Sequence, residues 1–128
     1  MLGLVVGLMV GAAQAPEHAE PTGPAAPLKI TAPIWRDRAT GQDVGRVYPR
    51  QALKERLDAA VIVECQVAAD GRMAACAVVR EEPGGYGFGE AALKLTPKFR
   101  MRATLADGTP VAGGVVRLPL RFVGPWNF

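Results

Sequence analysis

The chain contains only two cysteines, Cys65 and Cys76, and they carry its most definite chemistry. A pair of thiols can ligate a metal, supply a nucleophile or close a disulfide. The one histidine, His18, lies far upstream, so these three residues fit none of the usual zinc spacings and a cysteine nucleophile has no nearby base. We therefore expect the cysteines to act structurally, and we expect no metal site.

The other reactive side chains offer little catalytic machinery. No serine occurs in the sequence, which excludes a serine nucleophile. The glycines between positions 84 and 89 fit neither a dinucleotide-binding motif nor a Walker motif. Nothing in the pattern brings two acidic side chains into one cleft, so we expect a protein that is not an enzyme and that has no cofactor. The acidic candidates are Glu64, Glu81, Glu82 and Glu90.

Length and charge limit the classes of partner. With 128 residues the chain has room for one small domain, and its net charge of +3 is not concentrated in a basic tract. Nucleic-acid affinity depends on clustered cations that neutralise phosphates. The sequence therefore does not favour nucleic-acid binding.

Residues 1–15 resemble a secretory signal, because they form an apolar run that ends in Ala13-Gln14-Ala15, a typical cleavage pattern. As a helix this run would reach about 22 Å, less than the ~30 Å hydrocarbon core of a membrane. No lysine or arginine precedes the run and Pro16 follows it, so both cleavage and retention as an inner-membrane anchor stay open. In either case we expect export to the periplasm.

Residues 16–47 are predicted to be a proline-rich linker and a lead-in to the domain. Prolines are frequent up to residue 34 and favour extended conformations, and this part shows little periodicity that would build a core. We expect the chain to contact the domain first at Ile34 and Trp35.

A β-hairpin is the clearest predicted element of the domain. Residues 61–68 alternate, with the apolar side chains of Val61, Val63, Cys65 and Val67 on one face. Asp70-Gly71 is a strong turn signal, and residues 72–80 form the return strand.

The hairpin register predicts the cysteine pairing. Directly opposed residues on antiparallel strands have Cα atoms about 4.5–5.5 Å apart, which suits a disulfide. An oxidising compartment would allow the bond to form. Two buried free thiols, or a three-residue turn with a bulge that defeats the pairing, are the alternatives. With a two-residue turn, the opposed pairs are Val67 with Ala74, Cys65 with Cys76, and Val63 with Val78.

Two short helices and a last strand complete the domain. A helix over 51–57 follows Pro49, and a helix over 88–95 has an apolar stripe suited to a core. Residues 114–122 alternate as a strand, and Pro119 within it cannot donate a hydrogen bond to a ladder. We therefore expect this last strand at the edge of the sheet.

These elements define an α+β domain over residues 48–123, in the order α-β-β-α-β. The hairpin and the C-terminal edge strand form a small antiparallel sheet that packs with the two helices. Residues 124–128 form a tail whose position the sequence leaves open.

The residues in this order resemble the TonB C-terminal domain family. Ala59 and Ala103 depart from the family pattern, which usually has glycine and proline at these positions. The features that carry the resemblance are Tyr48-Pro49 with Ala52 soon after, the alternating valines of the first strand, Asp70-Gly71-Arg72, the Phe88-led helix with Ala91-Ala92, Phe99-Arg100, Gly108-x-Pro110-Val111 and Pro119-Leu120-x-Phe122.

The resemblance implies a binding role in TonB-dependent transmembrane transport. An extended segment of an outer-membrane transporter, the TonB box, would add as a strand to the exposed edge of the last strand. A role as an energy transducer would also require inner-membrane motor proteins. The alternative is a periplasmic scaffold or homodimer that uses the same edge and has no transporter partner. The implied partner-binding residues are Val115, Val116, Arg117, Leu118, Leu120 and Arg121.

Overall fold

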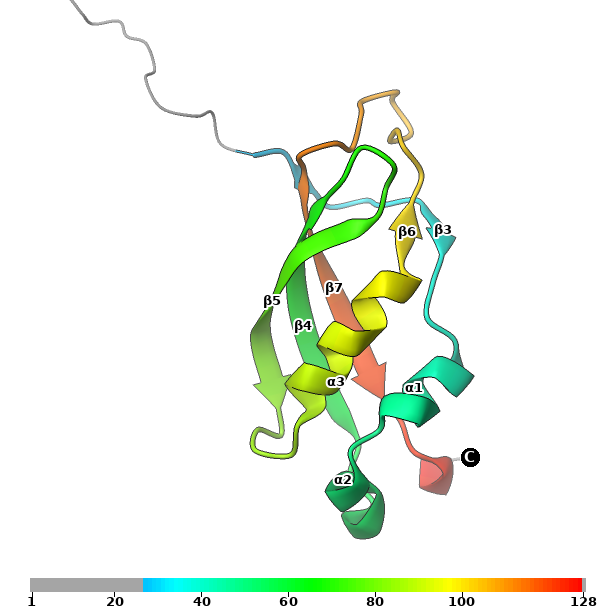
Figure 1. The fold of residues 1–128 in the computed structure, drawn as a ribbon, viewed down its shortest axis with the longest axis vertical. Helices are drawn as coiled ribbons and strands as arrows, with labels where there is room; N and C mark the ends of the chain where they lie inside the picture. The colour runs from blue at the N-terminus through cyan, green and yellow to red at the C-terminus, as the bar shows by residue number, and fades with distance from the viewer. Residues whose placement is uncertain (1–26, 128) are drawn as a thin grey trace, which may run out of the picture.

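The computed structural model describes residues 27–127, which form an α+β domain around one mixed sheet (Figure 1). Four strands lie in the order β2-β7-β4-β5. β5 and β7 each pair antiparallel with β4, whereas β2 pairs parallel with β7. The α+β class expected from the sequence is confirmed. The strand bounds are Lys29–Ile30 for β2, Ala59–Val67 for β4, Met73–Glu82 for β5 and Val115–Phe122 for β7.

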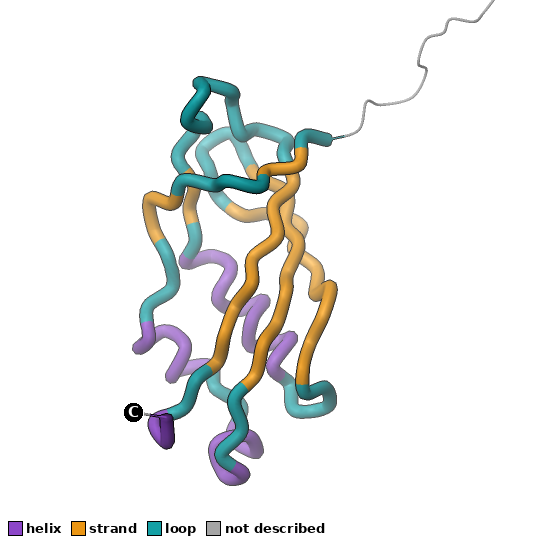
Figure 2. Tube along the Cα trace, turned by 180° about the vertical axis from the view of Figure 1, so that it is seen from behind, coloured by secondary structure: helices purple, strands orange, loops and turns teal. Residues whose placement is uncertain are grey.

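Three α-helices and a two-stranded ribbon accompany this sheet. α3 lies across one face of the sheet, and Figure 2 shows the opposite face free of helices within the described residues. In the ribbon, β3 pairs antiparallel with β6. The helices are α1 at Gly41–Val47, α2 at Arg50–Glu55 and α3 at Phe88–Leu95, with short 3-10 helices at Thr96–Lys98 and Pro125–Asn127; the ribbon strands are β3 at Trp35–Asp37 and β6 at Arg100–Met101.

The hydrophobic core lies between α3 and the sheet. Alternation along β4 turns Val61, Val63 and Cys65 inward, and each is at most 1% exposed. Phe88 and Phe122 meet them from α3 and β7, with ring centroids 5.2 Å apart. Burying one such side chain contributes about 1.5–3 kcal/mol, so this alternation suffices to hold the hairpin against the helix.

The hairpin between β4 and β5 forms as predicted, but its register shifts along the ladder. Val63 faces Val78, as the count across a two-residue turn predicts. Val67 faces Met73, so the pairing predicted with Ala74 is wrong by one residue. Irregularities in the ladder add residues to β5 that a simple count across the turn cannot include.

The disulfide between Cys65 and Cys76 is confirmed, with the two Cα atoms 4.1 Å apart. It lies at one of the register shifts, where two residues of β5 oppose Cys65. One of them is Ala75, whose φ of +49° is rare for a residue with a Cβ. A bulge therefore accompanies the cysteine pairing without preventing it.

The lead-in to the domain begins earlier than the sequence predicts. Ile30 is 5% exposed and belongs to the core, so the expectation that Ile34 and Trp35 make the first contact is wrong. The chain is already paired at Leu28, whose carbonyl accepts a hydrogen bond from the Val115 N–H at 2.8 Å. A strand of two residues is too short to show a period, which is why the pattern does not reveal it.

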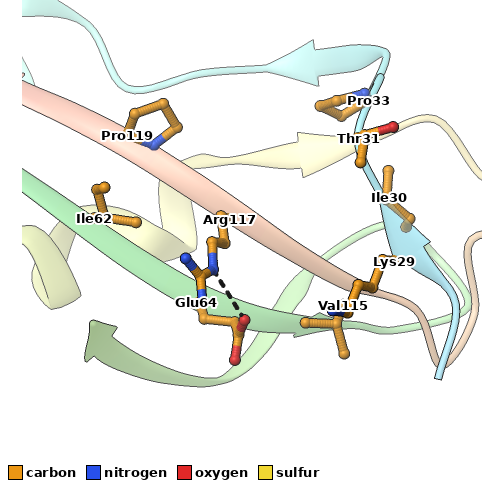
Figure 3. Close-up of a pocket in the computed structure, with 9 residues that line it drawn as sticks. All are labelled: Lys29, Ile30, Thr31, Pro33, Ile62, Glu64, Val115, Arg117 and Pro119. Carbon is orange, nitrogen blue, oxygen red and sulfur yellow. Dashed lines mark hydrogen bonds and ion pairs between the residues drawn. The ribbon is translucent and has the colours of Figure 1, made fainter. Parts of the chain in front are cut away.

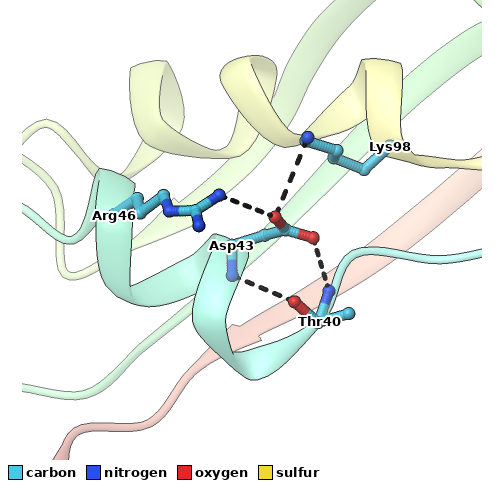
Figure 4. Close-up of polar contacts among 4 residues, drawn as sticks. All are labelled: Thr40, Asp43, Arg46 and Lys98. Atoms are coloured by element: carbon cyan, nitrogen blue, oxygen red, sulfur yellow. Dashed lines mark hydrogen bonds and ion pairs between the residues drawn. The ribbon is translucent and has the colours of Figure 1, made fainter.

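α1 is a helix that the sequence analysis does not predict. Thr40 caps it: its hydroxyl accepts from the Asp43 N–H at 3.1 Å, and its own N–H donates to the Asp43 carboxylate at 2.9 Å (Figure 4). The hydrogen bond from the Thr40 N–H is the main reason why the pKa of Asp43 lies below its ordinary value. Lys98 and Arg46 lie 3.8 and 3.7 Å from the same carboxylate. The missed signal is the capping pattern T-x-x-D at residues 40–43.

The C-terminal tail folds back on the loop that precedes β4. Asp58 accepts hydrogen bonds from the Gly124 N–H at 3.0 Å, from the Trp126 indole N–H at 2.9 Å and from the Asn127 amide. The Trp126 ring lies edge-on to Tyr48, with centroids 5.9 Å apart. The tail thus closes one end of the core, a position that the sequence leaves open.

Within residues 27–127, no helix is long and apolar enough to span a membrane. The signal predicted in residues 1–15 and the first part of the proline-rich linker lie outside the described residues. Export therefore stays a prediction.

Candidate functional site

The predicted docking strand is β7, whose backbone hydrogen-bonding groups point alternately to two sides. The Val67 N–H donates to the Gly114 carbonyl at 2.8 Å, so the even-numbered positions of β7 direct their backbone groups to β4. The Val115 N–H points the other way, to the Leu28 carbonyl. The residues whose backbone groups point away from β4 are Val115, Arg117, Pro119 and Arg121.

β2 covers the first part of this outward side. It pairs with β7 at Val115 and Val116, so the prediction of an edge strand is wrong at these two residues. From Arg117 to Phe122, no strand within residues 27–127 pairs with β7 on this side (Figure 2). We call residues 117–122 the open edge. Pro119, which cannot donate, lies in its middle.

The side chains of the predicted partner-binding residues divide between the two faces of the sheet. Val116 and Leu118 are in the core, at 1% and 2% exposure, and Leu120 beside them is half-buried. A partner can therefore meet only the backbone of the first two. The side chains on the opposite, helix-free face are those of Val115, Arg117 and Arg121, of which the two arginines are exposed.

The two arginines of the open edge differ in their surroundings. Arg117 Nε lies 3.2 Å from Glu64 Oε2, and both side chains are largely exposed. Such an exposed pair contributes about 0.2–1 kcal/mol at most. Among the described residues, Arg121 makes no salt bridge within the 4.0 Å limit. Arg121 is therefore the more available cation for an acidic partner.

Two cavities flank the open edge, and sequence reasoning missed most of their walls. The outer cavity, of about 400 Å³, lies on the helix-free face and is lined by Lys29, Ile30, Thr31, Pro33, Ile62, Glu64, Val115, Arg117 and Pro119 (Figure 3). The inner cavity, of about 430 Å³, is lined by Thr31, Pro33, Trp35, Arg38, Phe99, Arg117, Leu118, Pro119 and Leu120. The one feature of the sequence that pointed to these walls was the apolar pair Ile34-Trp35 in the lead-in to the domain.

In the part of the chain that the structure describes, acidic and metal-binding side chains do not gather at one place. Glu64 pairs with Arg117, and Glu82 lies 3.3 Å from Arg80 on β5. Within residues 27–127, no three histidine, cysteine, aspartate or glutamate side chains are grouped so that they could hold a metal ion. The arrangement at the open edge offers backbone pairing and apolar contact.

Three comparisons relate this geometry to known proteins. The family described as Gram-negative bacterial TonB protein C-terminal matches residues 44–123. An uncharacterized protein of Caulobacter vibrioides is 35% identical over 63 residues. This match covers 49% of the present chain and 63% of the length of that relative. The solution NMR structure of the Pseudomonas aeruginosa TonB CTD superposes with a TM-score of 0.49 and 19% identity, over 78% of this chain and 86% of that chain.

Proposed function

Because this chain belongs to the Gram-negative TonB C-terminal family, we propose that its open edge docks the TonB box of an outer-membrane transporter by strand addition. Membership confirms the resemblance drawn from the sequence. The family is periplasmic, couples energy to transport and is not a family of enzymes. Its members generally interact with outer-membrane transporters, which supports this kind of partner.

The observation that carries the proposal is the outward side of β7 between Arg117 and Phe122. The outward N–H of Arg117 serves the parallel ladder with Ile30 of β2. Beyond it, the Arg121 N–H points to the open side, together with the carbonyls of Arg117, Pro119 and Arg121. Unpaired backbone groups along a strand are a template for another strand. The missing donor at Pro119 limits how closely a second copy of the sheet could pair there, so it also protects the edge from aggregation.

Backbone pairing alone would give weak docking. Each net hydrogen bond contributes about 0.5–1.5 kcal/mol, so a handful of them barely offsets the ~4–15 kcal/mol cost of association. Side chains of the docked segment must therefore contribute. The exposed cation of Arg121, the mainly apolar outer cavity and the mixed polar and apolar inner cavity are the groups nearest to such side chains.

An NMR titration of the full chain with a synthetic TonB-box peptide tests the proposal. We expect amide shifts centred on residues 117–122 and slower hydrogen exchange of the Arg121 amide. Arg121→Ala should weaken binding, whereas Arg80→Ala on β5, at the opposite edge of the sheet, should not. Unchanged spectra at millimolar peptide would refute docking.

Pro119→Val provides a gain-of-function test. It adds an outward N–H at the centre of the open edge, worth about 1 kcal/mol, so the peptide should bind several-fold tighter. The same variant should associate with itself more readily. If instead the unmodified chain shows a concentration-dependent mass and no response to peptide, the scaffold alternative is correct.

A further inference from the structure

We infer that one end of the domain is a docking surface for a bilayer that contains anionic phospholipid. This surface does not include the open edge, so the inference is independent of the proposed function. Three segments form it, at the end of the molecule that lies away from α2 (Figure 1). We call it the loop end, and its segments are residues 28–38, 68–72 and 100–113.

Backbone hydrogen bonds fix the three segments against one another. The Met101 N–H donates to the Gly71 carbonyl at 2.8 Å, and the Arg102 N–H donates to the Ile34 carbonyl at 2.9 Å. Gly71 has a φ of +89°, and a Cβ at this position would collide with the Met101 carbonyl, so the close approach requires glycine. The charged side chains of the loop end are therefore held on a rigid frame.

Cations outnumber carboxylates at the loop end. Asp70 is already bound by Arg72, whose Nε lies 3.1 Å from Asp70 Oδ2, and Asp107 accepts a hydrogen bond from the Thr109 N–H at 2.9 Å. These two acidic side chains thus have partners within the protein. The cations are Lys29, Arg36, Arg38, Arg72, Arg100 and Arg102, and the carboxylates are those of Asp37, Asp70 and Asp107.

Two of these cations line one cavity that has no carboxylate in its wall. Arg36 of β3 and Arg102, which follows β6, share this cavity of about 560 Å³. Among the described residues, neither arginine makes a salt bridge within 4.0 Å. A phosphate group between them would offset their mutual repulsion, because guanidinium donates paired hydrogen bonds to phosphate oxygens. Trp35, Ala103 and Thr104 complete the wall.

Uncharged side chains between the cations favour a bilayer over an acidic peptide as the partner. Leu28 is 42% exposed at this end, and the loops beside it expose short apolar side chains that suit the headgroup region. The described chain also begins here (Figure 1), downstream of the apolar run of residues 1–15. A single weak apolar anchor needs a second attraction, such as a basic surface, to hold a protein at a membrane. The exposed short side chains are those of Ala68, Ala69, Ala103, Ala106 and Ala112.

Co-sedimentation of the full chain with lipid vesicles tests the inference. One set of vesicles is a three-to-one mixture of phosphatidylcholine and phosphatidylglycerol, and the other is phosphatidylcholine alone. The chain should bind the mixed vesicles more tightly, and high salt should remove this difference by screening. Arg36→Gln with Arg102→Gln should weaken binding to the mixed vesicles about 25-fold, since each cation near an anionic surface contributes a factor of about five. Arg50→Gln with Lys54→Gln on α2, at the opposite end, is the matched control with the same change of charge and should have little effect.

Hydrogen exchange of the unmodified chain gives a second measurement that does not depend on how the variants fold. Mixed vesicles should slow exchange of the amides in residues 103–112 and leave those of α2 unchanged. Equal binding to both kinds of vesicle would show that the upstream apolar run acts alone, and equal losses in the two double variants would reduce the effect to net charge; either result overturns the inference. If the chain instead binds poly-glutamate through Arg36 and Arg102 but does not bind mixed vesicles, the partner is an acidic protein and the bilayer is wrong.

Discussion

Reduction of the Cys65–Cys76 disulfide should destabilise the domain, because the unfolded chain then gains conformational entropy that the bond had removed. The bond joins residues 11 positions apart, and closing a loop of about that length contributes about 2.8 kcal/mol at 25 °C on chain-entropy grounds. Cys65 is 1% exposed and would stay packed as a small apolar side chain, so reduction opens no large cavity. The loss should therefore be close to this value, which for a domain of this size lowers the melting temperature by about 10–20 °C.

Urea and thermal unfolding of the full chain, with and without a phosphine reductant, measure this loss. The denaturant slope should rise on reduction, because the released unfolded chain exposes more surface. A double variant, Cys65→Ala with Cys76→Ala, is the control and should not respond to the reductant. Two titratable thiols in the untreated protein, or a melting temperature that reduction leaves unchanged, would refute the reasoning.

Three further predictions concern the ends of the core and α1. Tyr48→Phe removes the hydroxyl that donates to the Leu57 carbonyl at 2.5 Å, and should lower the free energy of unfolding in urea by about 1 kcal/mol. Tyr86→Phe removes a more exposed hydroxyl and should lower the free energy of unfolding by less than about 0.5 kcal/mol. Equal losses in the two variants would contradict the importance given to the buried Tyr48 hydroxyl. Asp58→Ala leaves the Gly124 and Trp126 donors without their acceptor; it should cost about 1–3 kcal/mol and shift Trp126 fluorescence to the red, whereas unchanged emission would show that the tail does not depend on Asp58. The pKa of Asp43 lies below its ordinary value of 3.8 in the folded state, chiefly because of the Thr40 N–H. Its stabilising effect is thus present above that value and lost as the pH falls through the folded pKa. The stability difference between the unmodified chain and Asp43→Asn should therefore shrink below about pH 4, and a difference independent of pH would be the contrary result.

The sequence alone determined the parts of this protein that depend on short-range patterns. The alternation of residues 61–68, the Asp70-Gly71 turn and the stripe of residues 88–95 each repeat over several positions, so they predict a hairpin and a helix that the structure contains. The disulfide followed from the same count across the turn. These predictions succeed because the β period of two and the helical period of 3.6 are properties of the backbone itself.

The local irregularities escaped the same reasoning. The bulge at Ala75 shifts the pairing of Val67 by one residue, and no alternation of apolar residues records an added residue of this kind. α1 has a capping pattern at residues 40–43 but no buried residue of its own, so hydrophobic periodicity gave no reason to place a helix there. Short elements with few core contacts leave little trace in a sequence.

The sequence likewise predicted one part of the candidate site, and the tertiary structure was needed for the other part. Alternation and Pro119 pointed to β7 as the docking strand, but only the tertiary structure decided how much of it is open. β2 covers Val115 and Val116, and residues 31–38 form a facing wall, although both belong to a stretch with the composition of a linker. The pairing of β2 with β7 joins residues more than 80 positions apart, so it forms only when the rest of the sheet and the core are in place. β2 has two residues, which are too few to show a periodic pattern in the sequence.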